Sequence, residues 1–410
     1  AINRTLRYFA GDRSIYVIQR GCDMKVCFFS PTAYSYFNPE RDKWAGGAET
    51  QQFLIAKHMV DRGVEVSFIV GDHGQPDVEV FDGIRVIKSF RPFAGNRKLR
   101  FASDMMKIRK AMKTAGADVY NQRSTSFYTG QMAFFAAGLG GKFTFSIGID
   151  YNCYPDCQGL LSFPMTALYR HGTRRADAVI AQTEKQRKLL VDNMGRNSVL
   201  IRNGIPILYR DEKELSRRSA APVPDGEEEK TRPDFLWVGS FRRRKRPELF
   251  LELARRVPEA SFTLIGGGGD EIRFHEEIVS EASAIRNVAY RGFLTPAAIE
   301  YYYARAYAYV NTSSLEGFPN TYLHSWRHGV PTLTIDIDPD GIIADNGIGF
   351  RAGNFEELVG RVRSLCASPS ERLEMSSRAI AYVRDNHDII ARGDDYIRLF
   401  EGLIAGKSDS

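Results

Sequence analysis

One segment of the chain, residues 313–331, joins the end of an apolar strand pattern, a glycine turn and the start of a helix around a single carboxylate, Glu316. The first N–H groups of an α-helix have no partner within the helix, and the helix dipole gives that end a partial positive charge. The N–H groups of Phe318, Asn320 and Thr321 would therefore suit a diphosphate, while Glu316 could accept hydrogen bonds from sugar hydroxyls. The segment predicts a site for an anionic ligand that is rich in hydroxyl groups.

Five consecutive cations, Arg242 to Arg246, follow the strand pattern at 235–239. A loop directly after a strand is a place where a departing diphosphate can meet the positive charge that it needs. The same loop could also be a solvated basic turn. If it serves a phosphate, Lys245 is expected at the leaving group, with either Arg244 or Arg242 beside it.

Two glycine turns stand where a backbone could approach a ligand closely. Gly46 and Gly47 precede a helical pattern, and Gly266 to Gly269 follow an apolar strand pattern. Glycine allows such an approach because it has no Cβ, although glycines are also common in ordinary turns. Asp150 follows the strand pattern at 143–149, where it could hold an acceptor hydroxyl or the donor sugar, or could cap a turn.

The elements that must position these residues form two similar halves. Short apolar runs alternate with helical patterns, which predicts parallel sheets with crossover helices. Strands are expected in the first half at 24–29, 64–70, 84–87, 119–120, 143–147 and 179–181, and in the second half at 235–239, 261–265, 288–290, 307–310 and 331–335. Helical patterns cover 46–61, 248–256, 355–365 and 371–403.

The change in residue composition between these halves predicts the domain boundaries. Residues 1–205 form a first Rossmann-like domain, and residues 233–375 form a second. The intervening residues, 206–232, contain prolines, serines and an acidic run, so they are expected to be a linker or an exposed insertion. The helices at 376–410 are expected to pack back toward the first domain, and Asn203-Gly204 is a candidate hinge.

The motif around Glu316 resembles the signature of family-4 retaining glycosyltransferases. Glu316-Gly317-Phe318 and the closing Gly329-x-Pro331 match that signature, which also has a second Glu eight positions after the first. The resemblance extends over about residues 24–400. It implies an α/β protein of the GT-B type, with two doubly wound Rossmann-like domains facing each other across a cleft. In that fold the acceptor lies mainly on the first domain and the donor nucleotide on the second.

Several residues take their expected roles from this resemblance. Lys245 matches the family's lysine, whereas Ser240 stands where the family has an arginine. Gly46-Gly47 would border the donor phosphates, and the segment at 290–293 would meet the nucleobase. The residues expected to take part in catalysis are Glu316, Lys245, Arg244 and Asp150. The residues expected to bind the donor are Gly46, Gly47, Ser240, Gly267, Arg291, Phe293, Gly317, Phe318, Pro319, Asn320, Thr321 and His324.

His324 stands at the position of the second glutamate of the signature. In the family that carboxylate accepts hydrogen bonds from both ribose hydroxyls. A neutral imidazole offers only one acceptor, so the exchange removes one charged hydrogen bond, on the order of 1.5–3 kcal/mol or roughly ten- to a hundredfold in affinity. Alternatively, the donor makes a different contact at this position.

These patterns predict a retaining glycosyltransferase that moves a hexose from a UDP- or GDP-linked donor to a glycan or lipid-linked acceptor in envelope polysaccharide biosynthesis. No metal site and no cofactor beyond the donor substrate are expected. One alternative is a sugar-nucleotide-binding or scaffold protein that has lost turnover, motivated by His324 and Ser240. Phosphorolysis or epimerisation fits less well, because no Schiff-base lysine can be placed and related epimerases lack the Glu-Gly-Phe motif.

Composition limits the class of protein and its partners. The chain has 410 residues, 43% of them hydrophobic, enough for two cores. Its net charge is +6, and the excess of positive charge lies in the first half. Basic clusters at 97–100, 107–113 and 174–175 could face an anionic membrane surface or an anionic acceptor, or could be a solvated face. Nucleic acid is not expected, because no helix-turn-helix or RNA-binding signature is present.

No run approaches the roughly 18 apolar residues of a membrane span, and the first twenty residues do not resemble a signal peptide. The sequence therefore predicts a cytoplasmic protein, either free or peripheral on the inner face of a membrane. The five cysteines are few and odd in number, which argues against a disulfide framework. Cys153 and Cys157 lack a second pair at zinc-like spacing.

Overall fold

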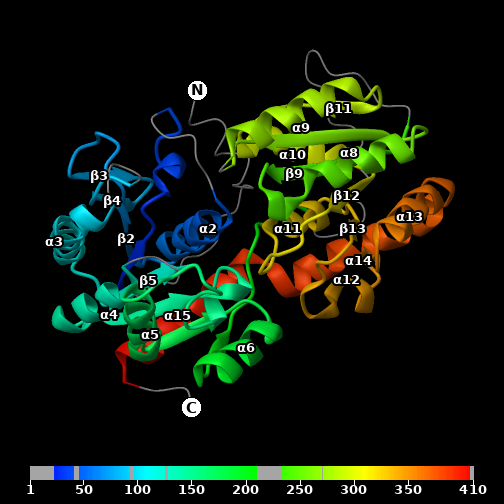
Figure 1. Ribbon diagram of the computed structural model, residues 1–410. Helices are drawn as coiled ribbons and strands as arrows, with labels where there is room; N and C mark the ends of the chain where they lie inside the picture. Colours follow the sequence, from blue (N-terminus) through cyan, green and yellow to red (C-terminus); the bar gives the residue numbers. More distant parts are fainter. Residues whose placement is uncertain are drawn as a thin grey trace. The chain divides into compact units, whose positions relative to one another are not determined.

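The computed structural model describes residues 23–40, 46–92, 97–124, 128–209, 232–269 and 271–406 (Figure 1). The chain forms two compact units that divide at Gly204/Ile205 and at Asp388/Ile389. We call the described residues up to Gly204, together with those from Ile389, the first unit, and Ile205–Asp388 the second unit. Most of the expected linker lies outside the described residues, as do the side chains at 97–99 in the basic cluster at 97–100.

The first unit is built on an eight-stranded sheet with the order β3-β4-β2-β1-β5-β6-β7-β8. All neighbouring pairs are parallel except β3 and β4, which are antiparallel. The strands are β1 (Lys25–Phe29), β2 (Glu65–Val70), β3 (Val78–Phe81), β4 (Ile84–Lys88), β5 (Val119–Arg123), β6 (Lys142–Ser146), β7 (Ala178–Ala181) and β8 (Val199–Leu200). The central strands are buried on both faces, which explains their nearly continuous apolar runs.

Helices cover this sheet, and the last of them comes from the end of the chain. The helices are α2 (Gly47–Asp61), α3 (Arg97–Ala115), α4 (Thr129–Gly138), α5 (Met165–Arg175), α6 (Glu184–Met194) and α15 (Ile389–Ile404). In Figure 1 the red α15 lies among the elements of the first unit. Its Tyr396, Leu399 and Phe400 are buried in the same core as β1 and β2.

The second unit has a six-stranded, all-parallel sheet with the order β11-β10-β9-β12-β13-β14. Its strands are β9 (Asp234–Ser240), β10 (Ser261–Gly267), β11 (Val288–Tyr290), β12 (Ala308–Asn311), β13 (Thr332–Thr334) and β14 (Gly349–Arg351). Its helices are α8 (Pro247–Arg256), α9 (Ile272–Ala284), α10 (Pro296–Arg305), α11 (Asn320–Arg327), α12 (Ile342–Asp345), α13 (Phe355–Ala367) and α14 (Pro369–His387). Two α/β domains with parallel sheets, as expected from the sequence, are therefore present.

The helical pattern at 371–403 is divided at Asp388, which has an extended backbone between α14 and α15. On one side of this break, α14 packs in the second unit, where Ser376 Oγ donates to the carbonyl of Gly329 at 2.6 Å. On the other side, Asp394 of α15 accepts from His58 of α2 at 2.7 Å in the first unit. The break is thus the point where the chain returns to the first unit.

The strand order of the second unit identifies where a ligand would bind. From β9 the chain adds β10 and β11 on one side, and then returns to place β12 on the other side of β9. At such a switch point the connections leave in opposite directions, and the carboxyl ends of the two strands leave a crevice that typically receives the ligand. The loops after β9 and β12 flank this point, and they contain the cationic run and Glu316.

Candidate active site

The two loops at the switch point are fastened to each other by hydrogen bonds. Thr312 Oγ1, just after β12, accepts from Trp237 Nε1 of β9 at 3.0 Å and lies 2.8 Å from the carbonyl of Lys245. The N–H of Ser314 donates to the carbonyl of Arg244 at 2.8 Å. Arg246 donates to the Thr312 carbonyl and pairs with Asp336. These contacts fix the relative positions of the cationic loop and the glutamate loop.

Glu316 and Lys245 form an ion pair across the two loops. Glu316 Oε1 also accepts from Ser313 Oγ at 3.0 Å. Among the described residues none donates to Glu316 Oε2, and the side chains of Glu316 and Lys245 are 11% and 21% exposed. The carboxylate is thus oriented through one oxygen while the other can take a hydrogen bond from a ligand.

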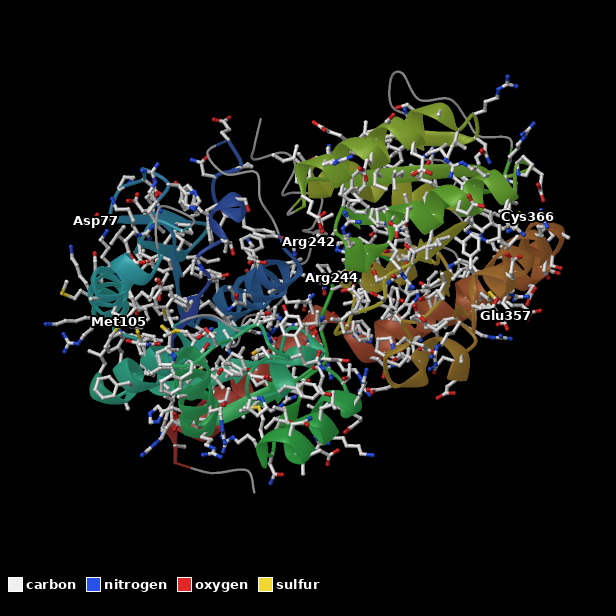
Figure 2. The ribbon with its side chains drawn as sticks, in the orientation of Figure 1. Asp77, Met105, Arg242, Arg244, Glu357 and Cys366 are labelled. Atoms are coloured by element: carbon white, nitrogen blue, oxygen red, sulfur yellow. The ribbon has the colours of Figure 1, made fainter. Side chains whose placement is uncertain are left out.

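The arginines of the cationic loop differ in their surroundings (Figure 2 labels Arg242 and Arg244). Arg243 is exposed, makes a 2.8 Å ion pair with Glu271 and lies over the ring of Phe274 at 4.7 Å. Among the described residues, the Arg244 side chain makes one long hydrogen bond, 3.4 Å from Nη1 to the Leu315 carbonyl, at the edge of the glutamate loop. Arg244 is therefore better placed than Arg243 to meet a ligand beside Lys245. Ser240, at the expected arginine position, is the last residue of β9, and its carbonyl accepts from the Arg242 N–H at 2.9 Å.

Helix α11 begins beside this pair, with Pro319 as its N-cap and Asn320 as its first residue. The N–H groups of Gly317 and Thr321 have no acceptor among the described residues. Phe318, in contrast, buries its side chain against Trp326 and His387, with ring centroids 6.1 and 5.0 Å away. Its side chain therefore anchors the helix start in the core.

The glycine turn after β10 requires glycine for steric reasons. Gly266 and Gly267, expected in the turn, are the last residues of the strand, with φ of +138° and +155°. A Cβ on Gly266 would lie 1.7 Å from the carbonyl oxygen of Gly239 in β9. The absence of a side chain thus lets β10 approach β9 at the carboxyl edge of the sheet.

The segment after β11 lies next to this turn. The carbonyl of Gly292 accepts from the N–H of Gly266 at 2.8 Å, and the N–H of Arg291 donates to the Leu264 carbonyl at 3.0 Å. Phe293, at the end of the segment, is 59% exposed. An apolar ring held at the edge of the sheet can stack on a planar ligand group.

His324 has a partner, Glu300, that no sequence motif marks. Its Nδ1 lies 2.8 Å from Glu300 Oε1 of α10, and its ring stacks on Tyr303 with centroids 5.5 Å apart. Glu300 also contacts Arg327, and it lies 2.7 Å from His328 Nε2. A carboxylate is therefore present beside His324, although it comes from a different helix.

Glu300 remains ionised because of these neighbours. Burial alone would raise the pKa of Glu300, but the charge of Arg327 and the hydrogen bonds of His324 and His328 outweigh burial and hold this pKa well below its usual value. The carboxylate is thus negatively charged at neutral pH and lies within a cluster of basic side chains.

Gly46, Gly47 and Asp150 belong to the first unit. Gly46 is the N-cap of α2, where a Cβ would lie 2.3 Å from a carboxylate oxygen of Glu49. Asp150 lies in a short 3-10 turn, pairs with Lys185 at 2.7 Å and accepts from Gln186 at 3.0 Å. These contacts stabilise the turn, and a role of Asp150 toward a ligand stays a prediction.

The first unit has a switch point of its own, between β1 and β5, and Arg123 ends β5 there. Its guanidinium is buried and donates to Asn203 at 2.7 Å, and burial lowers its pKa. No motif in the sequence marks Arg123. Arg123 stands three residues after the strand pattern at 119–120, and a cation near the carboxyl end of a parallel strand is the signal that could have found it.

Within the described ranges, no group of three or more His, Cys, Asp or Glu side chains is arranged to hold a metal ion. No helix in the same ranges has both the length and the apolar character that crossing a membrane would take.

Family comparisons match both halves of the chain. The profile described as "Glycosyltransferase Family 4" matches residues 45–207, and the one described as "Glycosyl transferases group 1" matches residues 232–368. No curated protein sequence matches the chain significantly.

Solved structures share the fold over most of the chain. Sucrose-phosphate synthase from Thermosynechococcus elongatus has a TM-score of 0.74 at 16% identity, covering 93% of this chain and 100% of its own. Anabaena HepE in complex with UDP and glucose has a TM-score of 0.69 at 17% identity, covering 92% of this chain and 99% of its own. An E. coli protein described as trehalose-6-phosphate bound with UDP-2-fluoro glucose has a TM-score of 0.68 at 12% identity, with 92% and 98% covered.

These matches do not favour the alternative of a binding protein without turnover, because both profiles describe transferases. The two parallel-sheet domains and the two profiles, one in each half, lead to the same assignment. The chain is a glycosyltransferase of GT-B fold, with the family-4 profile in its first half and the group 1 profile in its second.

Proposed function

We propose that this glycosyltransferase moves a hexose from a UDP- or GDP-linked donor to a glycan or lipid-linked acceptor, with retention of the anomeric configuration, in envelope polysaccharide biosynthesis. The observation that carries the proposal is the Glu316–Lys245 pair at the β9/β12 switch point, with Glu316 Oε2 open to a ligand. Similar folds that hold UDP or UDP sugars support UDP-hexoses as the first donors to test.

In this proposal the second unit binds the donor along the carboxyl edge of its sheet. The diphosphate lies at the start of α11, near the N–H groups of Gly317 and Thr321, with Lys245 and Arg244 at the leaving group. The nucleobase lies against the exposed ring of Phe293. Glu316 Oε2 accepts a hydrogen bond from a hydroxyl of the hexose.

The reaction breaks the bond between the anomeric carbon and the phosphate oxygen and forms a bond from that carbon to the acceptor oxygen. Negative charge develops on the leaving diphosphate, so Lys245, Arg244 and the helix N-terminus lower the barrier most when that charge is largest. Positive charge develops on the sugar ring, and the Glu316 carboxylate stabilises it. The departing phosphate oxygen takes the proton of the acceptor hydroxyl on the same face, which gives retention.

Glu316→Gln tests the proposal, because it preserves the shape of the side chain and removes its charge. We expect UDP- or GDP-hexose turnover, measured as nucleotide release, to fall by about a hundredfold or more. Glu271→Gln is the matched control, since Glu271 is an exposed partner of Arg243. The proton spectrum of the product reports the anomeric configuration. Undiminished turnover in Glu316→Gln, or an inverted product, would contradict the proposal.

We further propose that a basic surface of the first unit contacts an anionic membrane carrying the acceptor. Two large apolar side chains before α5, Leu160 and Phe163, are 63% and 85% exposed. Arg170, Arg174 and Arg175 of α5 are exposed as well. Exposed apolar groups beside cations suit a membrane interface with anionic lipids.

Vesicle co-sedimentation tests this contact. We expect binding to phosphatidylglycerol vesicles, weaker binding to phosphatidylcholine vesicles, and loss of binding in Phe163→Ser. Ile272→Ser is the control, because Ile272 is also highly exposed but belongs to the second unit. Equal binding by both variants would refute the assignment of this surface.

A further inference from the structure

The imidazole of His324 is held in one orientation. Its Nδ1 is engaged by Glu300 at 2.8 Å, and one ring face is covered by Tyr303, with 19° between the two ring planes. The side chain is 24% exposed, and Nε2 has no hydrogen-bond partner among the described residues. One nitrogen of the ring is therefore fixed by the protein, and the other is available to a ligand.

Glu300 determines which nitrogen carries the proton. The Glu300 carboxylate can only accept hydrogen bonds. Its Oε1 contacts His324, and its Oε2 pairs with the guanidinium of Arg327, a buried side chain that is 2% exposed. In the neutral imidazole, a carboxylate at Nδ1 places the proton there and leaves Nε2 as a hydrogen-bond acceptor. The Glu300–His324 pair thus presents an acceptor at a defined point.

The position of His324 Nε2 on α11 indicates which part of the donor it can contact. His324 stands four residues after Asn320, so both lie on the same face of α11, about one turn apart. Helix α10, which carries Glu300, follows the segment that ends at the exposed Phe293. With the diphosphate at the start of α11 and the base at Phe293, the group between them is the ribose.

We propose that Glu300 is a positioning residue for the donor: it holds His324 so that Nε2 accepts a hydrogen bond from a ribose hydroxyl. This inference rests on the proposed function. It also accounts for His324 at a position where the family signature has a glutamate, because the carboxylate acts here from α10 through the imidazole. A glutamate at residue 324 would place a second negative charge beside the Glu300 carboxylate, and the two charges would repel each other.

Nucleotide binding, measured by calorimetry with UDP and GDP and with their 2′-deoxy and 3′-deoxy forms, tests the inference. For the nucleotide that binds, we expect at least one deoxy form to bind about three- to tenfold more weakly to the wild type. His324→Ala should bind the ribonucleotide more weakly than the wild type does, by about the same factor. It should bind that deoxy form as tightly as the wild type does. Glu300→Gln should show part of this loss of affinity for the ribonucleotide.

The double variant separates positioning from general damage. If Glu300 acts through His324, then Glu300→Gln in the His324→Ala background weakens ribonucleotide binding no further. A purely structural role would weaken the ribonucleotide and the deoxy form by the same factor, and this result would overturn the inference. Glu374→Gln, an exposed position on α14, is the control for loss of a carboxylate.

Two further outcomes are distinguishable. If the wild type binds neither nucleotide, the proposed function fails and the inference falls with it. If the wild type binds a nucleotide and both single variants bind it equally well, the proposed function stands and the role of Glu300 is refuted. Because Glu300 also contacts the buried Arg327, thermal melting of Glu300→Gln must show a folded protein. If it does not, Glu300→Asp takes its place in the same double-variant comparison, because it keeps the charge beside Arg327 and shortens the reach toward His324.

Discussion

Lys245 and Arg243 lie two residues apart in one loop, but their partners differ. Lys245 contacts Glu316 at the switch point, whereas Arg243 is occupied by the exposed Glu271. We expect Lys245→Ala to lower kcat by about a hundred- to a thousandfold with a smaller change in KM, because the cation acts on charge that develops in the transition state. Steady-state kinetics with the active nucleotide hexose measures this.

Arg243→Ala is the matched control for a lost cation in the same loop. Exposed ion pairs contribute little to stability, so loss of the Arg243–Glu271 pair should leave the loop intact. The kcat of Arg243→Ala should therefore stay within a few-fold of the wild-type value. Equal losses in the two variants would mean that the general positive charge of the loop matters and that the position of Lys245 does not.

Glu300 makes the stability of the second unit depend on pH in a defined direction. Because the folded-state pKa lies well below the usual value, the carboxylate stabilises the fold above the unfolded-state pKa of about 4.3. This contribution is lost as the pH falls through the folded-state pKa. Glu300→Gln should therefore melt well below the wild type at pH 7, and the difference should shrink progressively below about pH 4.

Melting temperatures at pH 7, 5, 4 and 3 give this comparison. Glu374→Gln removes an exposed carboxylate and should follow the wild type at every pH. A gap between Glu300→Gln and wild type that stays constant down to pH 3 would show that the ionised carboxylate is not the source of the stabilisation.

At the scale of elements, α15 is fitted to α2 through a glycine. A Cβ on Gly393 would lie 2.2 Å from the ring of His58, which is buried and bonded to Asp394. The ring cannot move aside without losing that bond. Gly393→Ala should therefore destabilise the first unit by about 1–3 kcal/mol despite the better helix propensity of alanine.

Gly360→Ala is the opposite case within a helix. Gly360 lies in α13, and a Cβ there would have no atom within 4 Å. The substitution should stabilise the second unit by up to about 1 kcal/mol. Thermal unfolding of both variants measures the two effects, and equal shifts would mean that the α2–α15 contact tolerates a methyl group.

Elements with strong local patterns could be predicted from the sequence. The runs at 24–29, 64–70 and 261–265 are strands, because buried parallel strands consist of continuous apolar residues. The division at Asp388 could not be predicted, since neither Gly nor Pro interrupts the helical pattern there. It is set instead by tertiary contacts, in which Ile205 donates to the His387 carbonyl at 2.8 Å.

The candidate site was predictable to the same extent. Glu316 and Lys245, selected from separate motifs, form an ion pair, because both motifs follow strands that are neighbours in the sheet. Glu300 could not be found, since it lies 24 residues from His324 in another helix and belongs to no recognisable motif. Contacts between side chains of different helices depend on packing, which local patterns do not encode.

At the scale of the whole molecule, the two units have separate cores. Phe400, at the end of the chain, is fully buried with β1 and β2 in the first unit, and Phe250 of α8 is fully buried in the second. A chain with two cores is expected to unfold in two steps. Only a unit that binds nucleotide is stabilised by it, by about 2.7 kcal/mol at a concentration a hundred times Kd.

Scanning calorimetry with and without the active nucleotide tests this division. Phe400→Ala should cost the first unit about 3–5 kcal/mol, which lowers its transition by roughly 10 °C, and should leave the nucleotide-dependent transition in place. Phe250→Ala should lower the transition that nucleotide raises. The end of the chain would then govern the stability of one unit and the nucleotide that of the other. If nucleotide instead raises the transition that Phe400→Ala lowers, the donor site extends to the first unit or lies there.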